Sequence, residues 1–131
     1  MTAQAATSLE QTVKLLLERL DAMDLDGLAA MVDDDIQGVD EISRRWMRGR
    51  LAIEGYFAQL KDAVSEVRSQ MSDVQEDTWA DAGLVTFVLD QTYTVNGQQQ
   101  TIVAPTSIVF RRRDSEWKIA LIHTVPLPDE A

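Results

Sequence analysis

Residues 83–110 have the sequence GLVTFVLDQTYTVNGQQQTIVAPTSIVF, and this stretch decides the fold. Its two halves are rich in β-branched and aromatic residues, which are typical of strands. The dipeptide Asn96-Gly97 between them is a signal for a tight hairpin turn. Pro105 has no N–H to give to a neighbouring strand, so it predicts a bulge or a sheet edge at that point. We therefore predict a long antiparallel hairpin.

A further strand is predicted on each side of this hairpin. Residues 66–80, EVRSQMSDVQEDTWA, come before it and alternate as a polar strand does. After it, the segment DSE at 114–116 turns the chain into WKIALIHTV at 117–125, and Pro126 and Pro128 end this last strand. The second half of the chain is thus predicted to form a four-stranded antiparallel meander.

The first half of the chain favours helices. A stripe of apolar residues at helical spacing predicts a helix near residues 8–22, and Thr7 with Glu10 forms a capping-box pattern at its start. Asp24 is a good N-cap for a short second helix, whose apolar stripe extends to Val32. The acidic run at residues 33–35 then begins the exit loop, because acidic residues are unfavourable at the end of a helix.

Two short extended pieces follow, near residues 36–39 and 45–48, around a turn. Gly49 then opens a third helix, in which apolar residues recur at three- and four-residue steps: Leu51, Ile53, Tyr56, Phe57, Leu60 and Val64. Helices grouped before a run of strands indicate the α+β class, with three N-terminal helices packed in a curved, mainly antiparallel sheet.

The 131 residues suit one domain with a core of its own. We assign residues 8–128 to this domain, 1–7 to a flexible N-terminal tail and 129–131 to a C-terminal tail. The absence of cysteine excludes a disulfide framework, a thiolate zinc site and a cysteine nucleophile. No signal peptide and no apolar run of membrane-spanning length is visible, so we expect a cytoplasmic protein that does not bind membranes.

The net charge of −10 makes nucleic acid an unfavourable partner, because such a chain repels phosphate backbones. Arginines do cluster locally, as at residues 111–113. We interpret these clusters as surface groups that pair with the abundant Asp and Glu side chains.

The arrangement of these segments resembles the SnoaL-like and ketosteroid-isomerase-like proteins of the nuclear-transport-factor-2-like superfamily. Three stretches carry the resemblance: LERLDAMDLDGLAAMVDDDIQ at 17–37, RGRLAIEGYFAQL at 48–60 and FRRRDSEWKIALIHTVPLP at 110–128. The resemblance implies a cystatin-like α+β roll, in which a bent sheet wraps around helices to form a cone with a pocket. It also implies a homodimer formed through the outer face of the sheet.

The resemblance can be tested against the chemistry of ketosteroid isomerases, which need a carboxylate base and two donors for an oxyanion. Asp40 lies within about one residue of the family's base. Leu16 occupies the position of the family's tyrosine donor, and residues 101–110 contain no acid to serve as the second donor. We therefore expect no isomerisation of the steroid type.

The SnoaL-type cyclases use an acid–base aspartate from the sheet, and Asp90 is the acid within the strong strands. Strand alternation places it opposite the more apolar set that contains Phe87, Leu89, Gln91 and Tyr93. We expect that apolar set to face the pocket and Asp90 to face outward.

His123, the only histidine, is the main catalytic candidate together with Asp40. Simple alternation puts His123 on one strand face with Trp117, Ile119 and Leu121, and so inside the cone. Many SnoaL-like relatives carry a serine two residues later, but this chain has Val125 there. A structural histidine, tied to a buried polar group, is the alternative.

Other residues are candidates for the pocket wall. Trp46 and Tyr56 lie on segments that border the cavity in the fold that the resemblance implies, and Leu16, Gln91 and Tyr93 join them. Asp40 and Glu41 form an acidic pair over the expected cavity mouth, which is either a base site or a solvated turn. One histidine and no cysteine offer no metal site, and we expect no cofactor.

Two functions follow. The first is binding of a small apolar or partly polar ligand in the cone, with cofactor-free proton-transfer chemistry of the isomerase, cyclase or dehydratase type. The second is a non-catalytic module for dimerisation or protein interaction. A ligand site should have a cavity of several hundred Å³ on which His123 and an acid converge, whereas an interaction module should have a cone filled by side chains.

Overall fold

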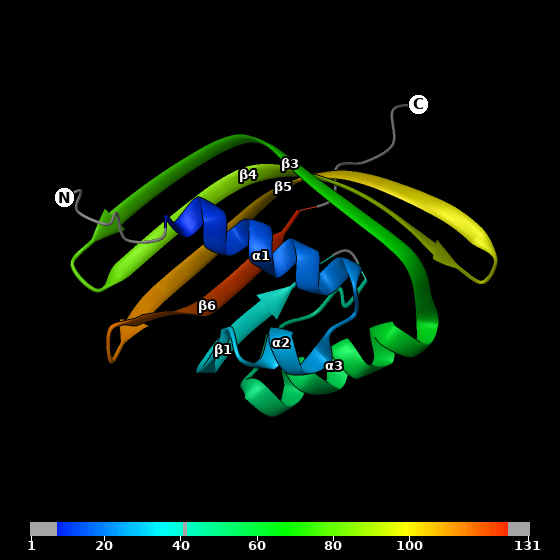
Figure 1. Cartoon of the computed structure of the whole chain (residues 1–131). Coiled ribbons are helices and arrows are strands. Elements are labelled where there is room, and N and C mark those ends of the chain that lie inside the picture. The colour runs from blue at the N-terminus through cyan, green and yellow to red at the C-terminus, as the bar shows by residue number, and fades with distance from the viewer. Residues whose placement is uncertain (1–7, 41, 126–131) are drawn as a thin grey trace.

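The structure, a computed structural model, describes residues 8–40 and 42–125. The predicted tails, Thr7, Glu41, Pro126 and Pro128 lie outside the described residues. The elements follow one another in the order helix, helix, two strands, helix, four strands (Figure 1). Their bounds are α1 Leu9–Asp21, α2 Leu25–Ala29, β1 Val32–Val39, β2 Met47–Arg48, α3 Arg50–Ala63, β3 Val64–Trp79, β4 Ala82–Val95, β5 Gln98–Arg113 and β6 Glu116–Thr124.

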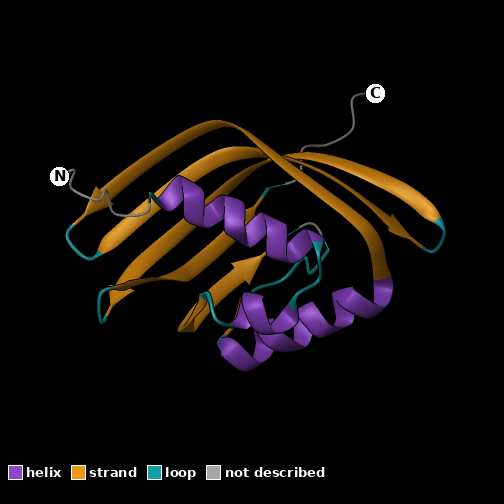
Figure 2. Ribbon diagram, viewed as in Figure 1, coloured by secondary structure: helices purple, strands orange, loops and turns teal. Residues whose placement is uncertain are grey.

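The strands form a six-stranded sheet in the order β2-β1-β6-β5-β4-β3. Strands β3 to β6 pair antiparallel with their neighbours in the chain, which confirms the predicted meander. Strand β1 joins the sheet parallel to β6, and the short β2 pairs with β1 at the edge. Figure 2 shows the curvature of the sheet, whose concave side holds the helices. The predicted α+β class is therefore confirmed.

The hairpin of β4 and β5 explains why the opening stretch decides the fold. The two strands pair without a break in register from Ala82 with Arg111 to Val95 with Gln98, around Asn96-Gly97. Both turn residues have positive φ, as a tight turn of this kind requires. Pro105 lies next to Thr106, where the pairing of β5 with β6 ends, and its carbonyl oxygen still accepts the backbone N–H of Val125 at 3.0 Å, so the missing N–H falls at the end of this pairing.

Helix α1 is fixed at both ends to the edge strand β3. At its N-terminus the Glu76 carboxylate accepts the backbone N–H groups of Leu9, at 3.1 Å, and Glu10, at 2.9 Å. At its other end Asp21 accepts the backbone N–H of Ser69 at 3.0 Å. These bonds provide acceptors for backbone N–H groups in the first turn of α1 and for one on the edge strand β3, which would otherwise have no partner within their own element. The capping box is made by Ser8 and Gln11, one residue later than the predicted pair.

The acidic run at residues 33–35 is not a loop, which corrects the prediction. These residues belong to β1, and Val32, the expected end of the helical stripe, begins that strand. The guanidinium group of Arg50 holds this junction: it donates to the carbonyl oxygens of Ala29 at 2.7 Å and Val32 at 2.6 Å, and to the Asp34 carboxylate at 2.9 Å. The three nitrogen atoms of this guanidinium group thereby bind the connection between α2 and β1 to α3.

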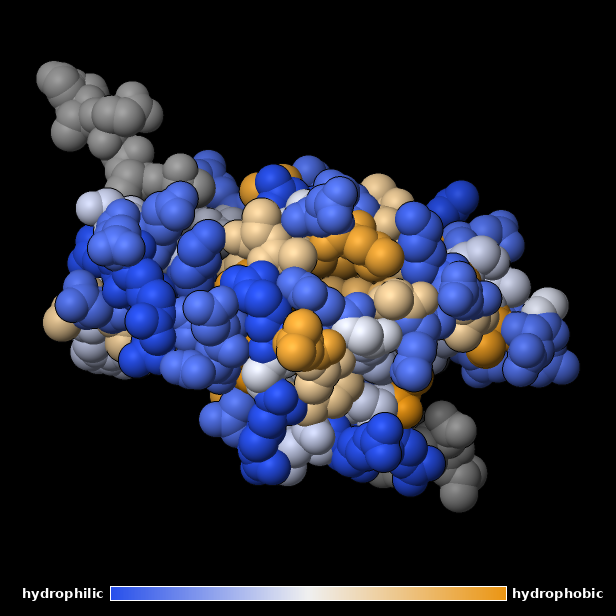
Figure 3. All heavy atoms as spheres, turned by 90° about the horizontal axis from the view of Figure 1, so that it is seen from below, coloured by the Kyte–Doolittle hydropathy of each residue, from blue (hydrophilic) through white to orange (hydrophobic). Residues whose placement is uncertain are grey.

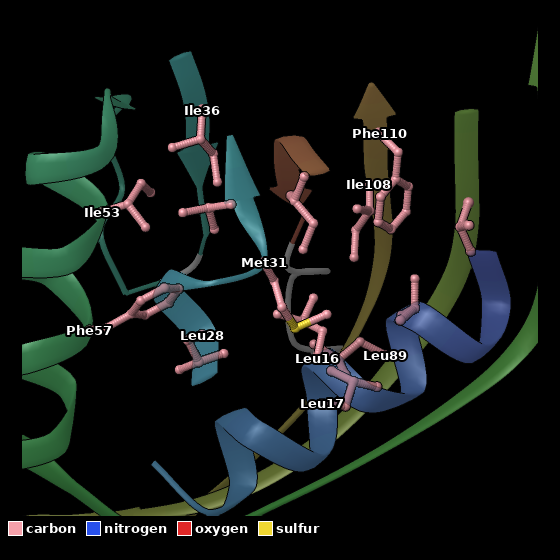
Figure 4. Packing of buried hydrophobic residues seen from close by; sticks show 14 of the residues in the cluster. Leu16, Leu17, Leu28, Met31, Ile36, Ile53, Phe57, Leu89, Ile108 and Phe110 are labelled. Carbon is pink, nitrogen blue, oxygen red and sulfur yellow. The ribbon is translucent and has the colours of Figure 1, made fainter. Parts of the chain in front are cut away.

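The core fills the space between the helices and the concave side of the sheet. Figure 4 shows Ile53 and Phe57 of α3 facing Ile36 of β1, while Leu16 and Leu17 of α1 approach Leu89 of β4. Leu51 is an exception to the predicted helical stripe, because its side chain is 84% exposed.

A β-bulge interrupts the pairing of β5 with β6. Val109 pairs with Leu121, whereas Phe110 pairs with Ile119, so Ala120 is an extra residue on β6. One extra residue exchanges the two faces for every side chain that follows it. Ile119 is accordingly buried, but Leu121 and His123 leave its face.

Candidate functional site

A cavity of about 90 Å³ lies between α1, α3 and the concave side of the sheet. Most of its wall is apolar, and Leu16 and Phe57 belong to it. The face shown in Figure 3 is hollowed where hydrophobic residues gather, with hydrophilic side chains around them. The polar residues of the wall are Asp40, Tyr56, Gln91, Tyr93, Thr106 and Thr124. The cavity is thus much smaller than the several hundred Å³ expected from a ligand site of this fold.

Asp40 and Tyr56 form a hydrogen-bonded pair on this wall. The Tyr56 hydroxyl lies 2.6 Å from Asp40 Oδ2 and 2.8 Å from Oδ1, and it donates to the carboxylate. The same Oδ1 accepts the backbone N–H groups of Ile42 at 3.0 Å and Ser43 at 2.8 Å. These backbone bonds make an Asx-turn, so Asp40 combines the two interpretations that the sequence left open, a turn residue and an acid on the cavity.

Gln91 of β4 is a buried residue of the cavity wall, at 7% exposure. Its Nε2 donates to Ser69 Oγ at 3.0 Å, and Ser69 Oγ in turn donates to Asp21 Oδ1 at 2.7 Å. A chain of hydrogen bonds therefore runs from the end of α1 through the edge strand to the cavity wall. The predicted alternation of β4 is confirmed: Phe87, Leu89, Gln91 and Tyr93 are buried, and Asp90 is exposed.

Two threonines form a polar spot on the wall. Thr106 and Thr124 are opposite each other on β5 and β6, and both are buried. Thr106 Oγ1 donates to the carbonyl oxygen of Ala104 at 3.1 Å and approaches Thr124 Oγ1 at 3.4 Å. Strand alternation could have identified Thr106, but Thr124 reaches the cavity only because of the bulge at Ala120.

His123 is not among the residues that line the cavity, which corrects the face predicted for it. Its neighbours Ile122 and Thr124 line the cavity, and alternation turns His123 to the other side of the sheet. There its ring lies 5.7 Å from that of Trp46, which is 45% exposed and carries Arg48 over its face. Trp46 therefore does not line the cavity either.

Trp46 belongs instead to an open recess of about 720 Å³ between α3 and the segment that precedes it. Arg45, Arg48 and the exposed Leu51 also line this recess. Ile42 and Tyr56 border both spaces. The cavity and the recess are thus adjacent.

A buried acid, Asp33, lies at the opposite end of β1 from Asp40, at 2% exposure. Arg113 Nε donates to its Oδ1, and Arg111 Nη1 lies 3.5 Å from Oδ2. Burial acts to raise the pKa of Asp33, but the hydrogen bond from Arg113, the Asp35 backbone N–H and the two positive charges together lower it below its usual value. The arginines at 111–113 therefore pair with acids as predicted, since Arg112 also lies 3.4 Å from Asp81.

Within residues 8–40 and 42–125, no three His, Asp or Glu side chains are placed to hold a metal ion. No helix of that part of the chain has the length and apolar character needed to cross a bilayer.

The family model of the SnoaL-like domain matches residues 9–127. The chain belongs to this SnoaL-like family. No curated protein has a significant sequence match to it.

Solved structures confirm the nuclear-transport-factor-2-like (NTF2-like), cystatin-like fold. A presumed dehydratase of the NTF2-like family from Streptomyces avermitilis is 16% identical, with a TM-score of 0.84 over 93% of this chain and 96% of that one. A presumed calcium/calmodulin-dependent protein kinase II association domain from Xanthomonas campestris is 18% identical, with a TM-score of 0.82 over 93% and 87% of the two chains. An NTF2-like protein with a cystatin-like fold from Novosphingobium aromaticivorans is 15% identical, with a TM-score of 0.75 over 95% and 82%.

Five of the residues that the sequence predicted for the site line the cavity: Leu16, Asp40, Tyr56, Gln91 and Tyr93. It missed Ser69 and Asp21, which reach the site only through Gln91. No sequence pattern could identify these two, because they lie 48 residues apart.

Proposed function

We propose that this SnoaL-like protein binds a small, mainly apolar ligand in the cavity, with Asp40 as the group that accepts a proton from it. The observation that carries the proposal is the pair of Asp40 and Tyr56 on an otherwise apolar wall. A few convergent polar groups in an apolar cavity are the usual pattern of a small-molecule site.

The size of the cavity limits the ligand. An engineered protein cavity of about 150 Å³ holds one benzene molecule. The cavity here, of about 90 Å³, suits one small ring or short chain, and any further part of the ligand would extend into the neighbouring recess past Ile42 and Tyr56. Arg45 and Arg48 line that recess and would favour an anionic or polar end there.

The available donors and acceptors favour elimination over enolisation. An enolate would need strong donors in the cavity, yet the Tyr56 hydroxyl already donates to Asp40 and Leu16 replaces the family's tyrosine. In dehydration, the Asp40 carboxylate would take a proton from carbon while the C–O bond breaks, and would pass that proton to the departing hydroxyl, so that an alkene and water form; hydration is the reverse. The Streptomyces relative is named as a dehydratase, which is compatible with this choice.

The test is a titration of small ring compounds against the labelled protein, followed by backbone amide shifts in NMR spectra. We expect the shifts to gather at Leu16, Phe57, Leu89 and Gln91. Asp40→Asn, which can keep the Asx-turn, should keep binding but abolish any elimination activity, and Asp90→Asn is the matched control on the outer face of the same sheet. Shifts confined to the outer recess would refute the cavity as the binding site.

A second function is supported by a different observation, on the outer face of the sheet. Trp46, Val103 and Val125 are each between 43% and 48% exposed, and the His123 ring lies beside Trp46. We propose that this face forms a homodimer. The Xanthomonas relative is named as an association domain, which agrees with this proposal.

Sedimentation at micromolar concentration tests the dimer. The wild type should sediment as a dimer, and Val103→Glu should convert it to a monomer, because a charge would be buried unpaired in the interface. Leu15→Glu, which adds the same charge at an exposed apolar residue of α1 on the concave side of the sheet, is the control. A monomeric wild type would leave ligand binding as the only proposal.

A further inference from the structure

The orientation of the Gln91 side chain carries a further inference, which rests on the proposed ligand site. The two ends of a carboxamide are distinguished by the hydrogen bonds around them. A carboxylate accepts hydrogen bonds, and the Ser69 hydroxyl donates its single proton to Asp21 Oδ1 across 2.7 Å. Ser69 Oγ is then left to accept, and Gln91 must offer its Nε2 across 3.0 Å.

The other end of the carboxamide, Oε1, is therefore an acceptor that faces away from Ser69. Among the described residues, none donates a hydrogen bond to Gln91 Oε1. The side-chain hydrogen bond of Gln91 runs from its Nε2 to Ser69 Oγ. Every fully buried side-chain polar atom of the described residues has a partner. Oε1 is thus accessible, and the cavity is the space that Gln91 lines. We infer that Gln91 Oε1 accepts a hydrogen bond from the ligand, so the site selects ligands with a hydroxyl or N–H donor.

Asp21 acts in this inference as a positioning residue that never touches the ligand. Its carboxylate binds both the N–H of Ser69, at 3.0 Å, and the Ser69 hydroxyl, so its charge sets the direction of the whole chain. Asp21→Asn can place its Oδ1 on the N–H and its Nδ2 on the hydroxyl oxygen. The Ser69 proton would then point to Gln91, and the carboxamide would turn to present its Nε2 to the cavity. The exchange of one Asp21 carboxylate oxygen for an amide nitrogen should thus change the ligand preference of the cavity from hydrogen-bond donors to hydrogen-bond acceptors.

The experiment uses three five-membered rings of similar size: pyrrole as a donor, tetrahydrofuran as an acceptor and thiophene as an apolar reference. Each is titrated into the labelled protein, and Kd is taken from backbone amide shifts of the cavity residues. The wild type should bind pyrrole at least about fivefold more tightly than tetrahydrofuran, the effect of about one net hydrogen bond. In Asp21→Asn this ratio should fall to one or invert, and the Gln91 side-chain amide protons should gain nuclear Overhauser contacts to bound tetrahydrofuran.

Asp26→Asn is the matched control, since it makes the same charge change on an exposed side chain and should keep the wild-type ratio. Ser69→Ala, which frees the carboxamide to turn, should bring the ratio close to one and provides the second variant if Asp21→Asn does not fold. Equal binding of pyrrole and tetrahydrofuran by the wild type would overturn the inference while the ligand site stands. A folded Asp21→Asn that keeps the wild-type ratio would also overturn it. Absence of cavity shifts with all three rings would overturn both proposals.

Discussion

The Asp33 cluster and the polar groups of the cavity wall differ in whether the protein already fills their hydrogen-bonding positions. At one end of the sheet, Asp33 is surrounded by the guanidinium groups of Arg111 and Arg113 and by the Asp35 backbone N–H. Among residues 8–40 and 42–125, none donates to Gln91 Oε1 at the cavity, and Tyr56 is the one donor to Asp40 Oδ2.

The difference separates a structural cluster from a candidate site. Asp33 has two arginine partners that lower its pKa, yet the hydrogen bonds of its carboxylate are already made within the fold. A perturbed pKa is a pointer to function only when the group is also open to a ligand. The cavity groups are better candidates because they keep an acceptor that the protein does not fill.

The largest expected effect compares one phenyl ring in each region. Phe110 is fully buried away from the cavity, whereas Phe57 lines it. Phe110→Ala should lower the free energy of unfolding by about 3–5 kcal/mol, because the close-packed surroundings cannot fill the space. Phe57→Ala should also destabilise the protein, but it should in addition admit larger rings.

Urea unfolding and titration with a two-ring compound such as naphthalene measure these two effects. Tight binding of naphthalene by Phe110→Ala, but not by Phe57→Ala, would contradict the assignment of the cavity.

The next effect concerns the structural acid. Asp33→Asn should lower the free energy of unfolding by about 2 kcal/mol at pH 7, less than for a fully buried pair because both arginines are half exposed. The folded-state pKa of Asp33 is lowered from 3.8, so this stability is present above pH 3.8 and is lost as the pH falls through the folded value.

Urea midpoints from pH 7 down to pH 2 should therefore converge for the wild type and Asp33→Asn. Asp34→Asn, an exposed neighbour, is the control that separates a general charge effect from this specific one. A stability difference that grows on acidification would contradict the paired, ionised Asp33.

A smaller effect is expected at the cavity acid. Asp40→Asn should cost less than about 1 kcal/mol, because an amide oxygen can still accept the N–H groups of Ile42 and Ser43. The comparison with Asp33→Asn uses the same chemical change at both acids. A loss as large as that at Asp33, measured by thermal unfolding, would mean that Asp40 serves the fold and not a ligand.

The smallest effect is expected at Leu51, the apolar helix residue that faces solvent. Leu51→Ser should change the free energy of unfolding by no more than about 0.5 kcal/mol, since an 84% exposed side chain buries little area. Ile53→Ala on the same helix, at 2% exposure, is the contrast and should cost about 2–4 kcal/mol. A large loss at Leu51 would indicate a partner over the recess.

The sequence alone determined the class, the order of the elements and the long hairpin, because these depend on local periodicity and on turn residues such as Asn96-Gly97. The inward face of β4, with Gln91 and Tyr93 on the cavity, also followed from alternation along a strand whose register is unbroken. Tertiary structure alone decided the rest. The extra residue Ala120 turned His123 to the outer face, since one added residue exchanges the faces of a strand. The tertiary structure also decided which end of the Gln91 carboxamide faces the cavity. That direction is set by Asp21, which is distant in sequence and reaches Gln91 through Ser69.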